Sequence, residues 1–310
     1  MRIAIVGAGA LGSLVGGLLA RAGHDVWLYN PSNVEHVRAI RSRGLCIEPP
    51  EGEVFSVHIE ATGNAEEIPR SPDLVGVFVK AYRTEEALRR VAPLLSEDTW
   101  LLSLQNGLGF EDVLVQYAPG RVLRGITAQG ATLLEPGRVR WAGRGPTRIG
   151  PWGYPSSPEP SQRAQEVVQA FDEAGLEASY EPSIKRALWE KLLVNAAINP
   201  LTALLDVPNG ALVEDPTLRE VLRDLVREAL PVVRSHGVDL SEEEAVRRVE
   251  EVCRATASNL SSMLQDVRRG RPTEIEFITG ALVREGERLG VATPLHRLLL
   301  EMVRRRSPRP

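Results

Sequence analysis

The glycine-rich start of the chain restricts its fold more than any other feature. Residues 2–6 form an apolar, strand-like run, GAGALG occupies residues 7–12, a small-residue helical stretch continues to Gly23, and residues 25–30 resemble a second strand. In the order strand, loop, helix and strand, the GxGxxG pattern is typical of a dinucleotide-binding unit. The alternative, that the glycines only form a turn and allow close packing, stays open from this pattern alone.

Each glycine of the loop has a predicted task. Gly7 permits a tight turn, Gly9 lets the backbone approach a pyrophosphate, and Gly12 lets helix and strand pack closely. Amide groups at the start of the helix would then face the phosphates. The predicted cofactor-binding loop consists of Gly7, Ala8, Gly9, Ala10, Leu11 and Gly12.

The residue at the end of the second strand bears on the choice of cofactor. An Asp or Glu there would hydrogen-bond the ribose hydroxyls of NAD and repel an added phosphate, but this chain has Asn30. Asn30 therefore favours NADP(H) as the cofactor. Because Pro31 and Ser32 follow instead of an arginine, NAD remains an alternative. Ser32 and Glu35 also match a capping box, and the helix that it starts would offer amides to a phosphate.

Two later strand-like runs end in polar residues. Residues 74–80 are apolar up to Lys80, and residues 100–107 are apolar up to the amide pair before Gly107. In open α/β sheets, ligands bind beyond the carboxyl ends of the strands, so Lys80 and Asn106 are candidates to meet cofactor or substrate. The alternatives are a solvated strand end for Lys80 and a simple turn at Asn106 and Gly107.

Composition excludes several classes of protein. The chain has 310 residues, 43% hydrophobic and 25% charged, enough for two domains with cores of their own. A net charge of −4 gives no reason to expect nucleic acid or an anionic membrane as a partner. No apolar run approaches the roughly 20 residues that span a bilayer, and two cysteines indicate reduced thiols in a cytoplasmic protein. The scattered histidines predict no metal site.

Strand signals fade after residue 182, and the periodicity becomes helical. We therefore expect an α/β protein with a Rossmann-type dinucleotide-binding domain at residues 1–182, followed by an all-α domain at residues 183–310. In the first domain, residues 122–134 and 138–150 are expected to extend the sheet. The helices expected in the second domain span residues 184–205, 215–236, 242–270, 273–289 and 294–305. Pro200 should end or kink the first of these helices near Asn199.

The first of these helices carries an unusual polar stripe. In WEKLLVNAAINP, residues 189–200, an otherwise apolar segment places Lys191, Asn195 and Asn199 at steps of four. Residues four apart lie on one side of a helix, so the three polar ends converge. A surface lysine on an amphipathic helix is the alternative for Lys191, but such a face would carry further charges.

The scarcity of lysine adds weight to Lys191. Only three of the 37 basic residues are lysines, namely Lys80, Lys185 and Lys191. Where any cation suffices, this chain uses arginine, so its lysines are enriched in positions that need an ammonium group. Lysine can release its proton within a protein and arginine cannot, which makes Lys191 a candidate acid or base.

A second polar constellation follows near residue 260. Asn259, Ser262 and Asp266 recur at steps of three and four and are predicted to share a helix face. Thr273 and Glu276 match a capping box for the next helix, which would place Glu274 in its first turn. On pattern alone, a favourable interaction with the helix dipole explains Glu274 better than chemistry does.

Four segments together carry a family resemblance. They are GAGALG at the start, LQNG at residues 104–107, KLLVNAAINPLTAL from Lys191 and NLSSMLQDVRRGRPTEIEFITG from Asn259. Over nearly its whole length the chain resembles the ketopantoate reductases, or 2-dehydropantoate 2-reductases. That family reduces ketopantoate to pantoate with NADPH on the route to pantothenate and coenzyme A, in a site between a Rossmann domain and a helical domain.

The resemblance implies roles for individual residues. Lys191 matches the general acid of the family, and Glu274 matches a second important carboxylate that holds substrate, cofactor or lysine in place. This reverses the preference for a dipole role of Glu274. The residues that match substrate contacts are Asn106, Asn195, Asn199, Asn259 and Ser262, with Asn106 between cofactor and substrate. Lys80 matches a lysine near the cofactor, and the implied cofactor is NADP(H).

Two further hypotheses remain from the sequence. The chain could be a reductase of another 2-keto or hydroxy acid on the same scaffold, because related β-hydroxyacid dehydrogenases also combine a lysine with an asparagine. It could also be an NADP-binding sensor without catalysis, although a lysine retained in an arginine-rich chain argues against this. A small-molecule substrate is expected for either kind of reductase, and the family resemblance implies ketopantoate. A homodimer is left open under every hypothesis.

Overall fold

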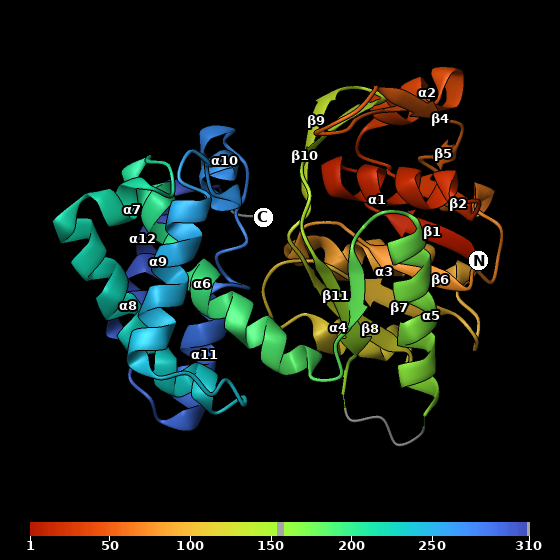
Figure 1. The fold of residues 1–310 in the computed structure, drawn as a ribbon. Coiled ribbons are helices and arrows are strands. Elements are labelled where there is room, and N and C mark those ends of the chain that lie inside the picture. The colour runs from red at the N-terminus through yellow and green to blue at the C-terminus, as the bar shows by residue number, and fades with distance from the viewer. Residues whose placement is uncertain (154–157, 309–310) are drawn as a thin grey trace. The chain divides into compact units, whose positions relative to one another are not determined.

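The structure, a computed structural model, describes residues 1–153 and 158–308. It divides into two compact units, which Figure 1 shows as ribbons. The first unit contains residues 1–105 and 110–184, and the second contains Asn106–Gly109 and Lys185–Pro310. The segment Asn106–Gly109 thus belongs to the second unit although the chain around it lies in the first.

The first unit is built on an eight-stranded sheet in the order β12-β11-β8-β7-β6-β1-β2-β5. All neighbouring strands are parallel except β8 and β11. The central strands are apolar because a parallel sheet is covered on both faces. The bounds are β1 Arg2–Val6, β2 Asp25–Tyr29, β5 Glu60–Thr62, β6 Leu74–Val77, β7 Trp100–Ser103, β8 Val122–Thr127, β11 Thr147–Pro151 and β12 Ala178–Tyr180.

Residues 122–134 and 138–150 do not simply extend this sheet, contrary to expectation. Strands β8 and β11 belong to it, but β9 (Gly130–Glu135) and β10 (Arg138–Gly143) join β3 (Leu45–Glu48) and β4 (Phe55–Val57) in a second sheet of order β4-β3-β10-β9. The reason is that β10 pairs with β3, a strand far away in the sequence. Arg138 of β10 lies opposite Cys46 of β3, which local patterns do not reveal.

Helix α1 (Ala10–Arg21) contacts both sheets, β1 and β2 on one side and β3, β9 and β10 on the other (Figure 1). This explains its small residues. A Cβ on Gly16 would lie 2.5 Å from the Leu28 side chain of β2, and a Cβ on Gly17 would lie 2.8 Å from Leu45 of β3. The other helices of the unit are α2 (Val34–Arg43), α3 (Thr84–Val91), α4 (Glu111–Tyr117) and α5 (Glu159–Glu173), and the 3-10 turn η2 (Ala81–Arg83) precedes α3.

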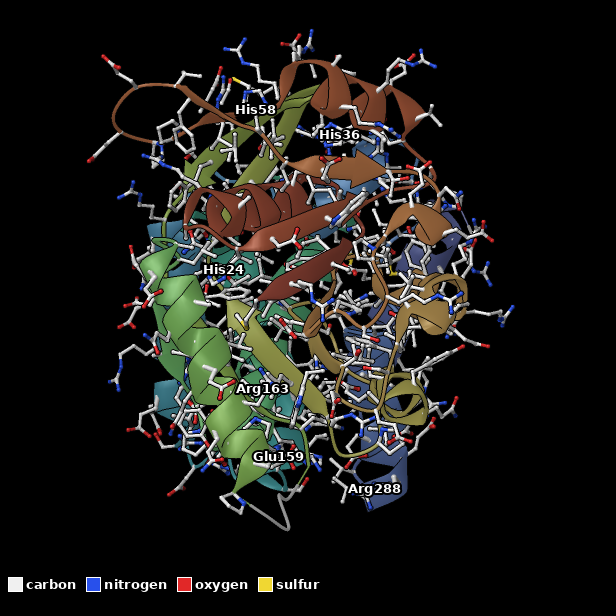
Figure 2. The ribbon with its side chains drawn as sticks, turned by 90° about the vertical axis from the view of Figure 1, so that its right-hand side faces the viewer. His24, His36, His58, Glu159, Arg163 and Arg288 are labelled. Atoms are coloured by element: carbon white, nitrogen blue, oxygen red, sulfur yellow. The ribbon has the colours of Figure 1, made fainter. Side chains whose placement is uncertain are left out.

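His36 of α2 ties three parts of this unit together. It is fully buried and labelled in Figure 2. Its Nδ1 accepts the Gly137 amide of the β9–β10 turn at 2.9 Å, so the proton sits on Nε2, which lies 2.9 Å from the Ser13 hydroxyl of α1. Burial lowers the pKa of His36 below the ordinary value of 6.5. The neutral ring therefore joins α1, α2 and the hairpin.

We expect this arrangement to make stability depend on pH. The unfolded chain binds the His36 proton more readily than the folded chain, so the contribution of His36 is complete above pH 6.5 and is lost as pH falls below it. Below pH 6.5, the free energy of unfolding should depend less steeply on pH in His36→Gln than in the wild-type protein. The slope should be smaller by up to about 1.4 kcal/mol per pH unit. Urea titrations of both proteins between pH 5 and 8 measure this. Parallel curves would show that His36 does not carry the dependence.

The second unit is helical, as expected. Its helices are α6 (Ile184–Leu205), α7 (Ala211–Glu214), α8 (Pro216–Arg234), α9 (Glu242–Ala255), α10 (Ser262–Arg268), α11 (Thr279–Leu289) and α12 (Pro294–Arg306). Helix α8 packs against α7, α9, α11 and α12. Among the described residues, no helix is long and apolar enough to cross a bilayer.

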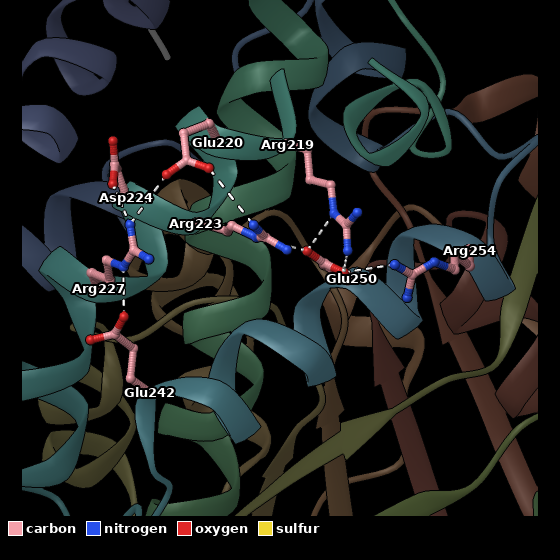
Figure 3. A network of polar contacts seen from close by, with 8 residues as sticks. All are labelled: Arg219, Glu220, Arg223, Asp224, Arg227, Glu242, Glu250 and Arg254. Atoms are coloured by element: carbon pink, nitrogen blue, oxygen red, sulfur yellow. Dashed lines mark hydrogen bonds and ion pairs between the residues drawn. The ribbon is translucent and has the colours of Figure 1, made fainter. Parts of the chain in front are cut away.

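Polar contacts reinforce the packing of α8 on α9 (Figure 3). The carboxylate of Glu250 accepts hydrogen bonds from Arg219 at 2.6 and 2.7 Å, from Arg223 at 3.1 Å and from Arg254 at 2.6 Å. Arg219 in particular lowers the pKa of Glu250 to about 2, with Arg254 and Arg223 acting in the same direction. Glu250 is therefore charged at neutral pH although its side chain is almost fully buried.

Three details of the helical prediction are wrong. Pro200 does not end its helix, because α6 continues to Leu205, and a kink near Asn199 stays a prediction. The expected helix 242–270 is interrupted between Ala255 and Ser262. The helix expected at residues 273–289 begins at Thr279 instead, since residue 274 forms a bend and residues 275–278 form turns. The side chain of Glu276 does not complete a capping box there; it pairs with Arg304 at 2.5 and 2.7 Å.

Candidate active site

The glycine loop has the geometry that close approach of a dinucleotide requires. Gly7 has φ +100°, and a Cβ there would lie 2.5 Å from the Val79 amide nitrogen. A Cβ on Gly12 would lie 2.4 Å from the Gly7 carbonyl oxygen, so helix and loop touch at that point. At Gly9 the nearest atom would be 4.0 Å away, which leaves space on its outer side. The first-turn amides of α1, at Ala10, Leu11 and Gly12, have no acceptor within the helix and suit a phosphate.

The side chain of Asn30 holds this loop in place through hydrogen bonds. Its Nδ2 donates to the Ala8 carbonyl at 2.8 Å, and its Oδ1 accepts the amides of Ser32 and Asn33 and the Ser32 hydroxyl at 3.0–3.2 Å. An aspartate could not donate to Ala8, so the amide is needed for the fold of the loop. Contact of Asn30 with a cofactor remains a prediction. The capping box expected at Ser32 is wrong, because Asn33 caps α2 by accepting the His36 amide.

A cleft lies beside the glycine loop within the first unit. It is lined by Gly7, by residues 29–32 at the end of β2, by Val79, and by Arg83, Glu86 and Arg90. Sequence reasoning missed the last three residues. Their only signal was the spacing of Arg83 and Arg90, seven residues or two helical turns apart, which repeats one face of a helix. Lys80 lies half-buried just before η2, after the end of β6.

Arg124 holds the strand end that leads to Asn106. This guanidinium on β8 is fully buried and donates to the Ser103 carbonyl and hydroxyl at 2.9 Å. It also pairs with the buried Glu111 at 3.1 Å and lies over the Phe110 ring at 4.6 Å. Burial lowers the pKa of Arg124, and Glu111 opposes that shift. The end of β7 is thus fixed by a charged group.

The segment Asn106–Gly109 packs against the turn that carries Glu274. The Leu108 amide donates to the Phe277 carbonyl at 2.8 Å, and the Phe277 amide in turn donates to the Glu274 carbonyl at 3.0 Å. Asn106 is half-buried and Glu274 is buried. The segment that contains Asn106 and the turn that contains Glu274 are therefore held together in one compact unit by the backbone hydrogen bond between Leu108 and Phe277.

Gly107 makes this docking possible. Its φ is +85°, and a Cβ would lie 2.4 Å from the Phe277 carbonyl oxygen. We expect Gly107→Ala to lower the free energy of unfolding by about 1–3 kcal/mol and to lower activity. The added methyl group would collide with the Phe277 carbonyl, so the backbone at residue 107 or at Phe277 must move. Thermal unfolding and turnover measure both effects. Gly120→Ala is the matched control, since it shares a positive φ but has nothing within 4 Å of the added carbon. Equal losses of stability and activity in both variants would show that the contact between Gly107 and the Phe277 turn does not cause the effect.

Helix α6 carries the polar stripe as predicted. Lys191 and Asn195 are half-buried and Asn199 is buried, all within the unbroken helix. Thr202, one turn further on, places its hydroxyl 3.0 Å from the carbonyls of Ile198 and Asn199. A hydroxyl therefore partners backbone carbonyls directly beside Pro200.

Asn259 and Ser262 do not share a helix face, contrary to expectation. Asn259 lies in the loop before α10, where its carbonyl accepts the Asn209 amide at 3.0 Å. Ser262 is the first residue of α10, whose cap is Ser261. Ser261 also lies 2.7 Å from the Thr202 hydroxyl of α6. Asn259 and Ser262 are both exposed. Asn259 is held by Asn209 in the loop after α6, and Ser261, the neighbour of Ser262, contacts α6 itself through Thr202. The sequence did not single out Thr202, Asn209 or Ser261.

Each unit therefore gathers a distinct part of the predicted site. The glycine loop, Asn30 and Lys80 lie in the first unit, and the second contains Lys191, Asn195, Asn199, Asn259, Ser262, Glu274 and Asn106. Within the part of the chain that the structure describes, no three His, Cys, Asp or Glu side chains form a group that could hold a metal ion.

Comparison with known proteins decides the family. The model described as "Ketopantoate reductase PanE/ApbA" matches residues 3–154, and that described as "Ketopantoate reductase PanE/ApbA C terminal" matches residues 183–307. The chain belongs to the ketopantoate reductase family. Among curated relatives in this family, the 2-dehydropantoate 2-reductases of Pyrococcus horikoshii and Halobacterium salinarum are each 40% identical to it. These matches cover 98% of this chain and 97% and 98% of theirs.

Solved structures of ketopantoate reductases share the fold. The 2-dehydropantoate 2-reductase of Geobacter metallireducens is 31% identical with a TM-score of 0.90, covering 98% of this chain and 99% of that one. D-mandelate dehydrogenase with NADH and anilino(oxo)acetate has the same identity and TM-score, covering 99% and 98%. The cofactor class of this ketopantoate reductase family member is thus a nicotinamide dinucleotide, which its glycine loop fits.

Proposed function

We propose that this chain is a 2-dehydropantoate 2-reductase, an oxidoreductase that reduces ketopantoate to pantoate with NADPH in the pathway to pantothenate and coenzyme A. The observation that carries the proposal is the α6 stripe of Lys191, Asn195 and Asn199 in a chain that matches curated 2-dehydropantoate 2-reductases from end to end. A dinucleotide loop alone would support only the cofactor class.

The reaction needs a hydride, a proton and a fixed substrate. The bound nicotinamide supplies the hydride to the C2 ketone. Lys191 faces the charge that develops on the ketone oxygen, stabilises it as an ammonium and donates the proton. In this mechanism Glu274 keeps the lysine and substrate in place, and Lys80 contacts the cofactor.

Amide and hydroxyl groups hold the substrate. Asn195 and Asn199 can each donate to and accept from its hydroxyl, because an amide has both kinds of group. Ser262 and Asn259 suit the carboxylate as donors, and Asn106 lies between cofactor and substrate. Orientation by such groups converts a collision into a positioned reaction.

A second candidate substrate follows from one solved relative. D-mandelate dehydrogenase has the same fold at a TM-score of 0.90, so the scaffold also accommodates an aromatic 2-hydroxy acid. In this chain that reading requires room for an aromatic ring beside α6. Under this second candidate function, Lys191 and the nicotinamide keep the same roles, and only the substrate pocket differs.

The test is the rate of NADPH oxidation with ketopantoate, compared with pyruvate and phenylglyoxylate. We expect rapid oxidation with ketopantoate and kcat/KM at least about 100-fold lower for the other two keto acids, because a substrate without the hydroxyl leaves the amides of Asn195 and Asn199 without the hydrogen bonds that they make to it. Comparable rates with phenylglyoxylate would favour the second candidate. Tight nucleotide binding without any turnover would favour a sensor.

A further inference from the structure

Recognition of the adenosine ribose lacks its usual groups in this chain. No Asp or Glu ends β2, and no basic residue follows it, since Pro31 and Ser32 stand there. Asn30 is committed to the Ala8 carbonyl and to the turn, with its side-chain oxygen accepting from Ser32 and Asn33. Other side chains must therefore distinguish NADP(H) from NAD(H).

The cleft beside the glycine loop supplies such side chains from a different element. Arg83 of η2 and Glu86 and Arg90 of α3 line the same cleft as residues 29–32. Arg90 donates to Glu86 at 2.8 Å and lines the cleft together with Tyr29, the last residue of β2. Glu86 and the Tyr29 hydroxyl both raise the pKa of Arg90. A guanidinium is thus anchored beside the strand end where the ribose of a bound dinucleotide lies.

The charges of this cleft favour a phosphate. Two guanidinium groups and one carboxylate line it, and both guanidinium groups belong to solvent-accessible residues. A phosphate monoester carries about −1.5 to −2 charge at pH 7 and accepts paired hydrogen bonds from arginine. Such an anion can take over hydrogen bonds from Arg90 that Glu86 now accepts.

We propose that Arg83 and Arg90 replace the missing basic residue after β2 and bind the 2′-phosphate of NADPH. This inference rests on the proposed function and names the groups that set its cofactor preference. Glu86 orients Arg90 but opposes the phosphate charge. If Glu86 instead accepted hydrogen bonds from free ribose hydroxyls, as an acidic residue after β2 does, the cleft would select NAD(H).

Binding of two cofactor fragments tests the proposal without catalysis. Isothermal titration with 2′,5′-ADP and with 5′-AMP compares ligands that differ only in the 2′-phosphate. The wild-type protein should bind 2′,5′-ADP at least about tenfold more tightly. Arg90→Gln and Arg83→Gln should each reduce binding of 2′,5′-ADP about tenfold or more and leave 5′-AMP nearly unchanged.

The chain offers a matched control one residue away. Arg89 also donates to a glutamate four residues earlier, Glu85, at 2.8 Å, but neither residue lines the cleft. Arg89→Gln should therefore leave both affinities unchanged. Glu86→Gln should tighten binding of 2′,5′-ADP relative to 5′-AMP, because it removes the opposing charge.

Three results would overturn the proposal. One is an equal loss of affinity for 2′,5′-ADP and for 5′-AMP in the arginine variants, which would show that Arg83 and Arg90 bind the adenine or the ribose that both ligands contain. Another is unchanged binding of 2′,5′-ADP, and the third is weaker 5′-AMP binding in Glu86→Gln, which marks an NAD site. The outcome is separate from that of the proposed function, since a protein that selects 2′,5′-ADP but does not turn over ketopantoate would refute only the latter.

Discussion

Replacing Lys191 with alanine is expected to lower kcat for ketopantoate reduction by about 100-fold or more, the typical loss when a positioned proton donor is removed. Lys191 lies on α6, one helical turn before Asn195, in a helix with no break up to Leu205. Its removal leaves the developing alkoxide without an ammonium group. Because the glycine loop and its cleft lie in the other unit, binding of 2′,5′-ADP should change little.

Two further variants make this expectation specific. Lys191→Arg keeps a positive charge but offers a group that does not release its proton, so its kcat should stay far below that of the wild-type protein. Lys185→Ala removes another lysine of α6, exposed at the start of the helix, and should retain full activity. If Lys191→Ala kept a kcat within a few-fold of the wild type, another group would have to donate the proton.

The largest loss of stability is expected for Arg124→Met. The side chains of Arg124 and Glu111 are 0% and 5% exposed, and their charges lie 3.1 Å apart. Removal of the guanidinium leaves the Glu111 carboxylate buried without the positive charge that faces it and takes a donor away from the Ser103 carbonyl. Breaking a buried pair in this way typically costs about 3–5 kcal/mol. Urea unfolding of the variant measures the loss.

A double-mutant cycle separates the pair from simple loss of packing. Arg124→Met combined with Glu111→Leu should be considerably more stable than the sum of the two single changes, because neither charge is then left buried alone. Arg121→Met removes a half-buried arginine one residue before β8 that donates to one carbonyl, Thr99, at 3.3 Å, and should cost about 1 kcal/mol. Strictly additive losses in the cycle would contradict the pairing.

Features set by short-range geometry were predictable from the sequence. The glycine loop was assigned because the turn from strand to helix needs glycine at residues 7 and 12. The structure agrees, since a Cβ at either position would collide with backbone atoms. Helix α6 was predicted with its observed bounds because its apolar positions continue over six turns. Pro200 does not end the helix, which runs on to Leu205, because a local rule for proline takes no account of packing around the helix.

Features set by long-range hydrogen bonds were not predictable. The spacing of Asn259, Ser262 and Asp266 fits a helix, but Asn209 binds the Asn259 carbonyl and Thr202 contacts Ser261, 59 residues away. The use of Asn30 as a support for Ala8 depends likewise on an acceptor 22 residues away. The arginines of the cleft were not predicted because they follow β6, far along the chain from β2, and only the fold brings them to the end of β2.

The segment Asn106–Gly109 has a consequence for protein engineering. Exchange of whole helical regions between relatives is naturally planned at the junction of Ile184 and Lys185, where the chain passes from one unit to the other. A chimera cut only there would combine the loop of one parent with the Phe277 turn of another. Four residues from the middle of the Rossmann-type sequence should therefore be transplanted together with the helices, as a second insert.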